Sequence, residues 1–475
     1  MNTPALRAMG PVAMGLGVQR TSPSPPDVTD LNGKEFRRAV AAITRSVTED
    51  LQDVETADAG AARPLIEAHV QRWARDRLVD ETPVGFATQR RLVDAVYDER
   101  FELGVLTPYI RDPAVESIDI NSCDQVWISY SDGARVRGPA VAASDGDLIN
   151  MIQMWVLHKS YTAREFSTAS PLANAALLPG ERDVSGVGVR LSAAMSVTDR
   201  PCVSIRCHRL VDVTLDDLTR LGTINRSLRA FLSAAVRARK NIVITGGTSA
   251  GKTTLLRALS AEIDPGERLI TLETDYELFL HKLPERHGNV VAYQARQANS
   301  EGAGAITLHE LIPDALRKNP DRIIVGEVRA DEIIPMFEAM NTGHPGSMCT
   351  IHADGTEEIF NRIVMLWTRG AGGQATPAPV IHLNTGETID FVVHLRTDRS
   401  TNQRFVSEVI EVLPPCDSDL PARNHIYRPA GPAGRALPHV TPQCLDDLVD
   451  AGLDPTLLDI HAATWPLPGR EGGGR

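Results

Sequence analysis

The amino-acid sequence predicts an α/β fold in which a parallel sheet follows a small α+β domain and a group of N-terminal helices. Two observations predict this class. From residue 241 onward, apolar strand-like segments alternate with helix-like segments, as in parallel sheets that are covered by helices on both faces. A glycine-rich loop joins the first of these strands to the first helix. The 475 residues allow two to four domains at about 100–200 residues each.

The composition is that of a globular protein with an acidic balance. The chain has 49 Lys and Arg against 61 Asp and Glu, which gives a formal charge of −12. This balance argues against duplex DNA or an anionic membrane surface as the main partner. The six cysteines are scattered along the chain and fit a reducing cytoplasm better than a disulfide framework. The sequence contains no run of 18 apolar residues that could span a membrane.

The chain before the parallel sheet divides into three parts. Residues 1–33 are rich in Pro, Ser and Gly and predict a disordered leader. In residues 34–104, apolar side chains recur every three or four positions and predict amphipathic helices. Helices that pack on their own domain fit better than membrane-surface helices, because their polar faces mix acidic residues with Arg. Residues 105–221 predict a small α+β domain, with strands at 117–121, 126–130 and 203–206 and a helix at 148–158.

The main domain is expected at residues 222–415. Short apolar runs predict its strands at 241–245, 269–272, 290–293 and 323–325, and residues 252–262 predict the helix after the glycine loop. Beyond residue 415 the chain is rich in Pro and ends in Gly-Gly-Gly-Arg. We therefore interpret residues 416–475 as a Pro- and Gly-rich C-terminal extension.

Residues 246–253 match the phosphate-binding loop pattern G-x-x-x-x-G-K-[ST] between an apolar strand and a helix. In such a loop, main-chain N–H groups converge on phosphate oxygens at a helix N-terminus. Lys252 is predicted to neutralise the β- and γ-phosphates, and the Thr253 hydroxyl to hold Mg²⁺. The residues expected to bind nucleotide are Gly246, Gly247, Thr248, Ser249, Ala250, Gly251, Lys252, Thr253 and Thr254. An ordinary glycine turn fits less well, because only six of the 49 basic residues are lysines and one stands at the required place.

Two carboxylates follow apolar strands and complete a candidate hydrolytic site. Glu327 follows the strand at 323–325, where Gly326 precedes the acid and the usual Asp is absent. Glu273 follows the strand at 269–272. One acid near Mg²⁺ and one that polarises water suit ATP hydrolysis. A surface acid after a core strand is the alternative interpretation of Glu327.

Two histidines stand near glycines that predict a tight turn. His344 follows Gly343 and precedes Gly346, and His352 lies eight residues further on. Metal binding lacks support, because no Cys or third His accompanies the pair. A role in sensing the γ-phosphate is weighed evenly against a purely structural role.

Four stretches of this region carry a family resemblance. They are 315–317 (Ala-Leu-Arg), 320–329 (Pro-Asp-Arg-Ile-Ile-Val-Gly-Glu-Val-Arg), 339–344 (Ala-Met-Asn-Thr-Gly-His) and 350–353 (Thr-Ile-His-Ala). With the loop at 246–254, they resemble the secretion ATPases of type II and type IV systems, and within them the CpaF/TadA group that powers tight-adherence (Flp) pilus assembly. The resemblance is strong over residues 225–400 and weaker over 100–210. It implies a RecA-like P-loop ATPase domain behind a small, PAS-like α+β domain.

The resemblance also assigns roles to single residues. It implies a Walker A loop at 246–253, a Walker B acid at Glu327, an aspartate box at 272–278 and a histidine box at 344–352, whose His352 we count with the catalytic residues. Glu273 would orient or activate water, and Glu327 would hold the water shell of the metal. Arg206 matches an arginine that family members supply to the phosphates from the N-terminal domain, and Arg190 is a second candidate. The alternative interpretation is that both are exposed surface arginines.

The chain departs from the family pattern at two places. Ser249 and Ala250 stand where Gly and Ser are usual in the phosphate loop. In the aspartate box, Asp275 stands one position later than the usual Asp, whereas Glu273 and Glu277 keep their places. The role of Asp275 is therefore left open.

The resemblance implies an ATP-hydrolysing motor with ATP and Mg²⁺ as cofactors. We expect a ring of six identical subunits that changes the angle between its two domains and acts on inner-membrane platform proteins. Such a protein would be cytoplasmic and peripheral at the inner face of the cell membrane, with indirect membrane contact and no nucleic acid as partner. Two alternative hypotheses are a DNA-handling motor for conjugation and a nucleotide-gated scaffold with low turnover.

Overall fold

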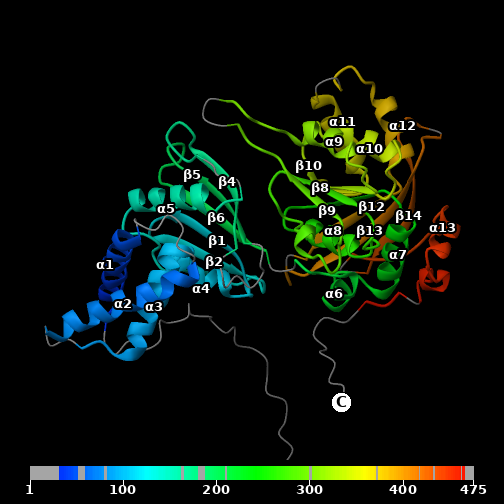
Figure 1. Ribbon diagram of the computed structural model, residues 1–475. Coiled ribbons are helices and arrows are strands. Elements are labelled where there is room, and N and C mark those ends of the chain that lie inside the picture. Colours follow the sequence, from blue (N-terminus) through cyan, green and yellow to red (C-terminus); the bar gives the residue numbers. More distant parts are fainter. Residues whose placement is uncertain are drawn as a thin grey trace, which may run out of the picture.

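The protein is seen in a computed structural model with two lobes (Figure 1). The structure describes residues 31–51, 59–79, 83–161, 165–179, 188–208, 211–298, 302–370, 373–398, 400–416, 418–431, 434–461 and 463–465. Most of the leader expected at residues 1–33 and the glycine-rich end lie outside these residues. The first lobe contains the N-terminal helices and a six-stranded sheet, and the second contains a nine-stranded sheet.

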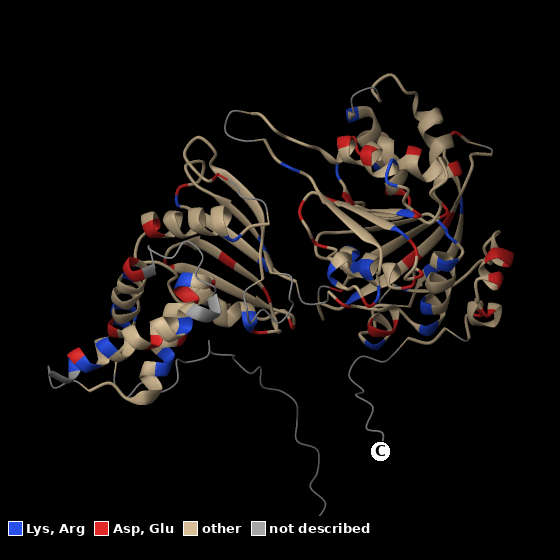
Figure 2. Cartoon of the chain, viewed as in Figure 1, with Lys and Arg blue, Asp and Glu red and all other residues tan. Residues whose placement is uncertain are grey.

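The N-terminal helices form a small bundle with its own core, as the apolar periodicity predicts. They are α1 (Gly33–Leu51), α2 (Ala59–Val79) and α3 (Phe86–Phe101). Val47, Ile66 and Leu92, one from each helix, are fully buried against one another. Figure 2 shows acidic and basic residues interspersed along these helices, which is unlike the basic face of a membrane-surface helix. None of the described helices is both long and apolar enough to cross a membrane.

The six-stranded sheet is entirely antiparallel and has the strand order β3-β2-β1-β6-β5-β4. Its strands are β1 (Val115–Ser122), β2 (Gln125–Tyr130), β3 (Arg135–Arg137), β4 (Leu172–Leu177), β5 (Val189–Ala194) and β6 (Cys202–Cys207). Helix α5 (Asp145–His158) begins at Ser144, whose side chain accepts a hydrogen bond from the Asp147 N–H. Its residues Leu148 and Ile152 bury in the core of this sheet. The short helices η1 (Gly104–Leu106) and α4 (Thr107–Arg111) link the bundle to the sheet.

The nine-stranded sheet has the order β15-β14-β13-β12-β7-β11-β10-β8-β9. Its strands are β7 (Ile242–Gly246), β8 (Leu269–Glu273), β9 (Val290–Gln294), β10 (Arg322–Val328), β11 (Met348–Ile351), β12 (Phe391–Thr397), β13 (Arg404–Leu413), β14 (Ala422–Ala430) and β15 (Arg435–Pro438). The run from β12 to β9 is parallel, and β13, β14 and β15 add antiparallel strands. Strand β11 separates β7 from β10. The parallel α/β sheet of the RecA-like type is therefore confirmed.

Helices cover both faces of this sheet, so its central strands are apolar on both sides. One face carries α6 (Leu215–Arg220), α7 (Arg226–Arg237), α8 (Lys252–Ser260) and α13 (Leu445–Asp450), and the other carries α9 (Leu308–Leu316), α10 (Ile333–Asn341), α11 (Glu358–Arg369) and α12 (Ala378–Thr388). Along β7, Ile242 and Ile244 pack with the first set, whereas Val243 packs with the second. Two short helices, η2 (Leu280–Lys282) and η3 (Pro455–Leu458), complete the lobe.

The segment expected as a C-terminal extension, residues 416–475, contributes β14, β15 and α13 to the second lobe. The Tyr427 hydroxyl lies 2.9 Å from Ser227 Oγ on α7. The Glu411 carboxylate on β13 accepts hydrogen bonds from the main-chain N–H groups of Gln443 and Cys444 at 2.9 and 3.2 Å. The described part of this segment therefore packs on the large sheet.

Candidate active site

The loop at 246–251 leaves strand β7 and enters helix α8 in the conformation that its glycines predict. Gly246 and Gly251 have φ values of 149° and 96°. A Cβ at Gly246 would lie 2.6 Å from the Leu395 carbonyl oxygen, so a larger residue does not fit there. Helix α8 has Gly251 at its N-cap, a residue without a side chain that could cap the first turn. Its free N–H groups are therefore available to an anion.

Ser249 shows the cost of the departure from the family pattern. Its φ is 60°, in the left-handed region, where a residue with a Cβ is less stable than Gly by roughly 1–2 kcal/mol. The family has Gly at this position, and this chain keeps the loop conformation without it. The loop geometry is therefore retained at some expense in stability.

Lys252 is buried beneath the loop. Its ammonium donates to the carbonyl oxygens of Gly246 and Gly247, each at 2.9 Å. Burial lowers the pKa of Lys252 to about 8, although the nearby Glu327 carboxylate partly opposes the shift. The ammonium thus stands at the loop, where a phosphate would restore its full charge.

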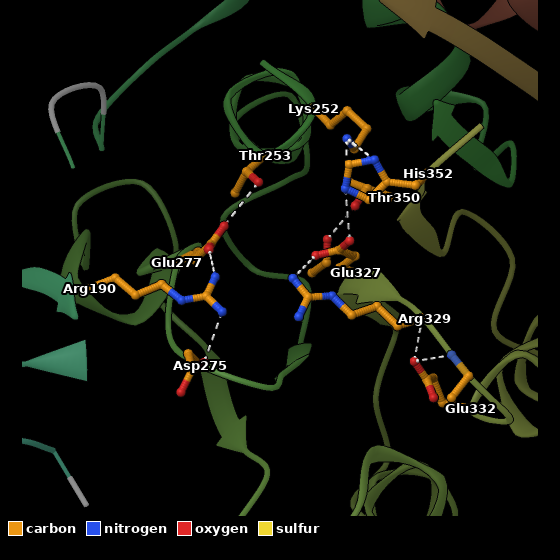
Figure 3. A network of polar contacts seen from close by, with 12 residues as sticks. Arg190, Lys252, Thr253, Asp275, Glu277, Glu327, Arg329, Glu332, Thr350 and His352 are labelled. Carbon is orange, nitrogen blue, oxygen red and sulfur yellow. Dashed lines mark hydrogen bonds and ion pairs between the residues drawn. The ribbon is translucent and has the colours of Figure 1, made fainter. Parts of the chain in front are cut away.

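His352 connects Lys252 to Glu327 (Figure 3). It directly follows β11, the strand between β7 and β10. Nδ1 of His352 lies 3.1 Å from the Lys252 ammonium nitrogen, and its Nε2 lies 3.1 Å from Glu327 Oε1. Burial, followed by the Lys252 charge, lowers the pKa of His352. A neutral ring that accepts from Lys252 and donates through Nε2 to Glu327 satisfies both contacts.

Glu327 lies near the end of β10 and also forms an ion pair with Arg329. The Thr350 hydroxyl, on β11, donates to the carbonyl oxygen of Gly326 at 2.7 Å and holds this part of β10 in place. Glu327 is joined through His352 to Lys252 of the phosphate loop, and its role at the metal stays a prediction.

Glu273 ends β8 and is 2% exposed. Its Oε1 accepts hydrogen bonds from the main-chain N–H groups of Glu277 and Leu278 at 2.9 and 2.8 Å. Its Oε2 is buried without a hydrogen-bond partner among the described residues. Burial raises the pKa of Glu273 to about 8. The structure thus places this carboxyl group inside the domain, where it holds the turn that carries Glu277.

Glu277 presents its carboxylate to the phosphate loop. The Thr253 hydroxyl donates to Glu277 Oε2 at 3.2 Å. Burial by itself raises the pKa of Glu277, but the charges of Arg190, His208 and Arg206 outweigh it and lower the pKa. From the sequence, Glu277 was expected only to match the family's aspartate box, and no role was predicted for it. Its placement depends on the turn after β8, which the local sequence pattern does not predict.

Arg190 and Arg206 reach the site from the first lobe. They are directly opposite each other in the β5–β6 ladder, so their side chains lie on the same face. Arg190 forms ion pairs with Glu277 and, at 3.1 Å, with Asp275 Oδ2 (Figure 3). Asp275, whose role the sequence left open, therefore lies in a bridge between the lobes.

Arg206 faces the same site without an ion pair or hydrogen bond to any described residue. It lines a cavity of 320 Å³ between the lobes together with the phosphate-loop residues Ser249, Thr253 and Thr254. The expected arginine is thus brought to the loop from the other domain. The exposed side chain of Arg206 opens into this cavity, and its role as a phosphate ligand stays a prediction.

His344 lies away from the phosphate loop and from His352. It precedes β11, and its Nδ1 lies 2.9 Å from the carbonyl oxygen of Pro320, which precedes β10. It therefore lies at the amino-terminal edge of the parallel strands, whereas the phosphate loop and His352 lie at the carboxyl edge. Of the two histidines, only His352 is placed to sense a bound phosphate.

The donor set fits a magnesium nucleotide. The Thr253 hydroxyl and the carboxylates of Glu277 and Glu327 are hard oxygen donors around the N-terminus of α8 (Figure 3). Among the described residues, no group of three or more His, Cys, Asp or Glu could hold a metal ion. Magnesium commonly binds through one or two protein oxygens and the phosphates of its nucleotide. Residues 246–254 and these acids are therefore suited to ATP with Mg²⁺.

Comparisons with known proteins indicate the family of the chain. The family model described as "Type II/IV secretion system protein" matches residues 180–393, a range that includes Arg190, the phosphate loop and Glu327. A Mycobacterium tuberculosis protein named "Putative conjugal transfer protein" is 32% identical over 304 residues, which cover 64% of this chain and 82% of that protein. The type IV secretion system protein VirB11 of Brucella suis is 27% identical over 332 residues, which cover 65% of this chain and 89% of VirB11.

A crystal structure of the Brucella suis VirB11 ATPase with sulphate aligns with 67% of this chain and 95% of its own, at 25% identity and a TM-score of 0.35. The family assignment does not depend on this superposition. It follows from the sequence identity and from the length shared with the Mycobacterium tuberculosis protein. The chain belongs to the type II/IV secretion system protein family.

Proposed function

We propose that the chain is the ATP-hydrolysing motor of a type II/IV secretion or Flp-type pilus assembly system. One observation carries the proposal: strand-end acids of the second lobe surround a phosphate loop, and arginines from the first lobe face the same loop. A site that spans two lobes can convert the charge change of hydrolysis into lobe movement. Family membership supports the ATPase assignment.

In this proposal, Lys252 and the N-terminus of α8 bind the β- and γ-phosphates of ATP. Thr253 and Glu327 hold the water shell of Mg²⁺, which would supply neutralising charge to the phosphates. Glu277 orients the attacking water and accepts its proton, because its carboxylate lies at the loop and the lowered pKa keeps it ionised. Glu273, assigned that task from the sequence, positions Glu277 through its main-chain contacts.

His352 has the role of a phosphate-sensing residue. It bonds to Lys252 and Glu327 at once, so a phosphate that draws Lys252 away from the loop carbonyls also changes the hydrogen bonding of Glu327. Arg206 and Arg190 would stabilise the charge of the transferring phosphoryl group, a contribution that reaches ~10³–10⁵ in rate for arginines of this kind.

We further propose that six copies form a ring at the inner face of the cell membrane and act on inner-membrane platform proteins. The resemblance of residues 315–353 to the CpaF/TadA group supports a pilus-assembly role. The need for an arginine from outside the second lobe supports a mechanism in which lobes or subunits close around ATP.

A conjugation motor that handles DNA is the second candidate. The name of the Mycobacterium tuberculosis relative favours it, whereas the formal charge of −12 weighs against it. Stimulation of ATP turnover by single- or double-stranded DNA would support this candidate over the pilus motor. A scaffold with little turnover would be recognised by tight nucleotide binding with negligible steady-state hydrolysis.

Exchange of Lys252 tests the proposed function directly. Lys252→Ala should abolish hydrolysis and weaken nucleotide binding, because the phosphates lose the only lysine ammonium at the loop. Turnover and ATP affinity are measured on the full chain, with Lys318→Ala as the matched control, since Lys318 forms an exposed pair with Asp314. ATP turnover in Lys252→Ala equal to that of the unmodified chain would disprove the assignment of the phosphate loop.

A further inference from the structure

The cavity between the lobes has a third arginine that the proposed function does not use. Arg404 begins β13 and lines the cavity with Ser249, Thr253 and Thr254. Its Cδ lies 3.5 Å from the position that a Cβ at Gly251 would take. The side chain of Arg404 therefore lies directly against the last glycine of the phosphate loop.

Arg404 is held by an acid from the other lobe. Its Nη2 donates to both carboxylate oxygens of Glu116, on β1, at 3.1 and 3.2 Å. Glu116 lines the same cavity, and Arg404 is its ion-pair partner among the described residues. Nε of Arg404 is buried and has no hydrogen-bond acceptor among the described residues. The guanidinium thus has a buried donor without an acceptor in the described part of the chain, and this donor becomes available to a ligand once the side chain moves.

The charges of the cavity favour a phosphate as the missing acceptor. Its lining includes Arg206, Arg257 and Arg404, and the acids Glu116 and Glu277. A phosphate that enters would repel Glu116 and offer two or more oxygens to a guanidinium, which binds such groups through paired hydrogen bonds. Arg404 would then exchange one anionic partner for another, and Glu116 would be released.

The position of Arg404 also indicates which part of the nucleotide it meets. Lys252, Glu327 and His352 form a connected group, and none of them lines the cavity that contains Arg404. Lysine in this motif reaches the β- and γ-phosphates. Arg206 and Glu277, which we assign to the γ-phosphate end, also line this cavity, so its lining alone does not separate the phosphates. Arg404 lies against Gly251 of the loop, and the main-chain N–H groups of such a loop cradle the α- and β-phosphates, so the contact of Arg404 is expected at that end.

We propose that Arg404 is a further nucleotide-binding residue, which contacts the phosphate chain at the end away from the γ-phosphate, and that Glu116 holds it until the nucleotide arrives. This inference rests on the proposed function, since it requires ATP in the loop. The contact is present with ADP and with ATP alike, so it contributes binding that is equal in the ground state and the transition state. Such a contact changes KM and leaves kcat unchanged.

The test is calorimetric titration of the full chain with Mg–ADP and with a non-hydrolysable Mg–ATP analogue, together with steady-state ATP turnover. Arg404→Ala should weaken both affinities about 10-fold or more, as expected for a lost hydrogen bond to a charged group, and raise KM with kcat preserved. Glu116→Gln should strengthen both affinities several-fold, because the competing carboxylate charge is removed. The double variant should bind like Arg404→Ala alone.

Arg229→Ala is the matched control, because Arg229 forms a comparable pair with Asp216 outside the cavity. If Arg404→Ala binds Mg–ADP as tightly as the unmodified chain, the inference is wrong. It is also wrong if Glu116→Gln weakens binding as Arg404→Ala does, since the pair would then only fasten the lobes. Absence of nucleotide binding by the unmodified chain overturns the proposed function itself, whereas the first two results leave that function intact.

Discussion

Gly326 makes the space that the side chain of Glu273 fills. A Cβ at position 326 would lie 3.0 Å from both Cγ and Oε1 of Glu273. This contact explains why Gly stands at position 326, because a side chain there would displace the carboxyl group that anchors the turn at Glu277. The absence of a side chain at Gly326 on β10 therefore leaves room for the Glu273 side chain at the end of β8.

Gly326→Ala should slow ATP hydrolysis by about 10-fold or more, since a shift of Glu273 moves Glu277 away from Thr253, and small displacements of catalytic groups are costly. Turnover of the full chain measures this effect. Gly288→Ala is the control, because a Cβ at that position meets only the Pro265 carbonyl oxygen at an ordinary 3.4 Å. Equal loss in both variants would show that the effect is not specific to Glu273.

Glu273→Gln should remove a pH dependence of stability. The pKa of Glu273 is about 8 in the folded protein against a usual 4.5, so the folded state keeps a proton that the unfolded state loses between these values. Stability from this group is present below pH 4.5 and declines as pH rises to about 8, with a slope of about 1.4 kcal/mol per pH unit. Calorimetric unfolding at pH 5–8.5 should show Glu273→Gln gaining on the unmodified chain as pH rises. A constant difference between the two proteins would contradict the raised pKa.

Glu277→Gln should keep ATP binding and slow hydrolysis by about 100-fold or more, because the amide cannot accept a proton. Glu273→Gln should be far more active at pH 7, since Glu273 is mostly neutral there. Single-turnover hydrolysis and nucleotide affinity separate the two effects. The reverse ranking would return the water-activating role to Glu273.

Arg206→Ala should lower kcat much more than it lowers ATP affinity, because its contact is expected with the charge that develops on the γ-phosphate. This pattern is opposite to the one expected for Arg404. Asp275→Asn, which removes a charge from the Arg190 bridge, should leave hydrolysis active. Unchanged kcat in Arg206→Ala would identify Arg206 as a surface residue.

Ser249→Gly should stabilise the protein by up to about 1 kcal/mol, because the left-handed conformation of residue 249 no longer carries a Cβ, although the added freedom of the unfolded chain offsets part of this gain. The measurement is the shift of the unfolding midpoint, with ATP turnover as a check that the loop is intact. Ser249→Ala should give no such gain. A midpoint that falls in Ser249→Gly would show that the serine side chain itself is needed.

Much of the fold could be predicted because the relevant signals are local. Apolar runs predicted β7 and β8 to within one residue at each end and β10 to within three, and the motif at 246–253 predicted where α8 begins. Strands β4 and β5 were not predicted, since short alanine-rich segments such as Leu172–Leu177 lack a clear apolar pattern. Helices α9 to α12 were likewise not placed in detail.

Most residues of the site could be predicted from the sequence, whereas the hydrogen bonds and ion pairs between them could not. Lys252, Thr253 and Glu327 follow from motifs, and Arg206 from the resemblance. The roles of Glu273 and Glu277 depend on which carboxyl group the turn after β8 buries, and the link between Arg190 and Asp275 joins residues 85 positions apart. Long-range pairings of this kind depend on how the two lobes pack together. A local sequence pattern contains no information about that packing.

Strands β14 and β15 add to the edge of the nine-stranded sheet, and this has a practical consequence for the design of shortened proteins. A protein cut at residue 415 would lack β14 and β15, and β13 would become an edge strand with its main-chain groups unpaired along one side. Phe231, which packs edge-on against Tyr427 at 5.4 Å between ring centroids, would lose this cover. Unprotected edges beside apolar surface promote aggregation. An expression fragment of the nucleotide-binding lobe should therefore extend to Trp465, whose indole N–H donates to Ala436 on β15 at 2.9 Å.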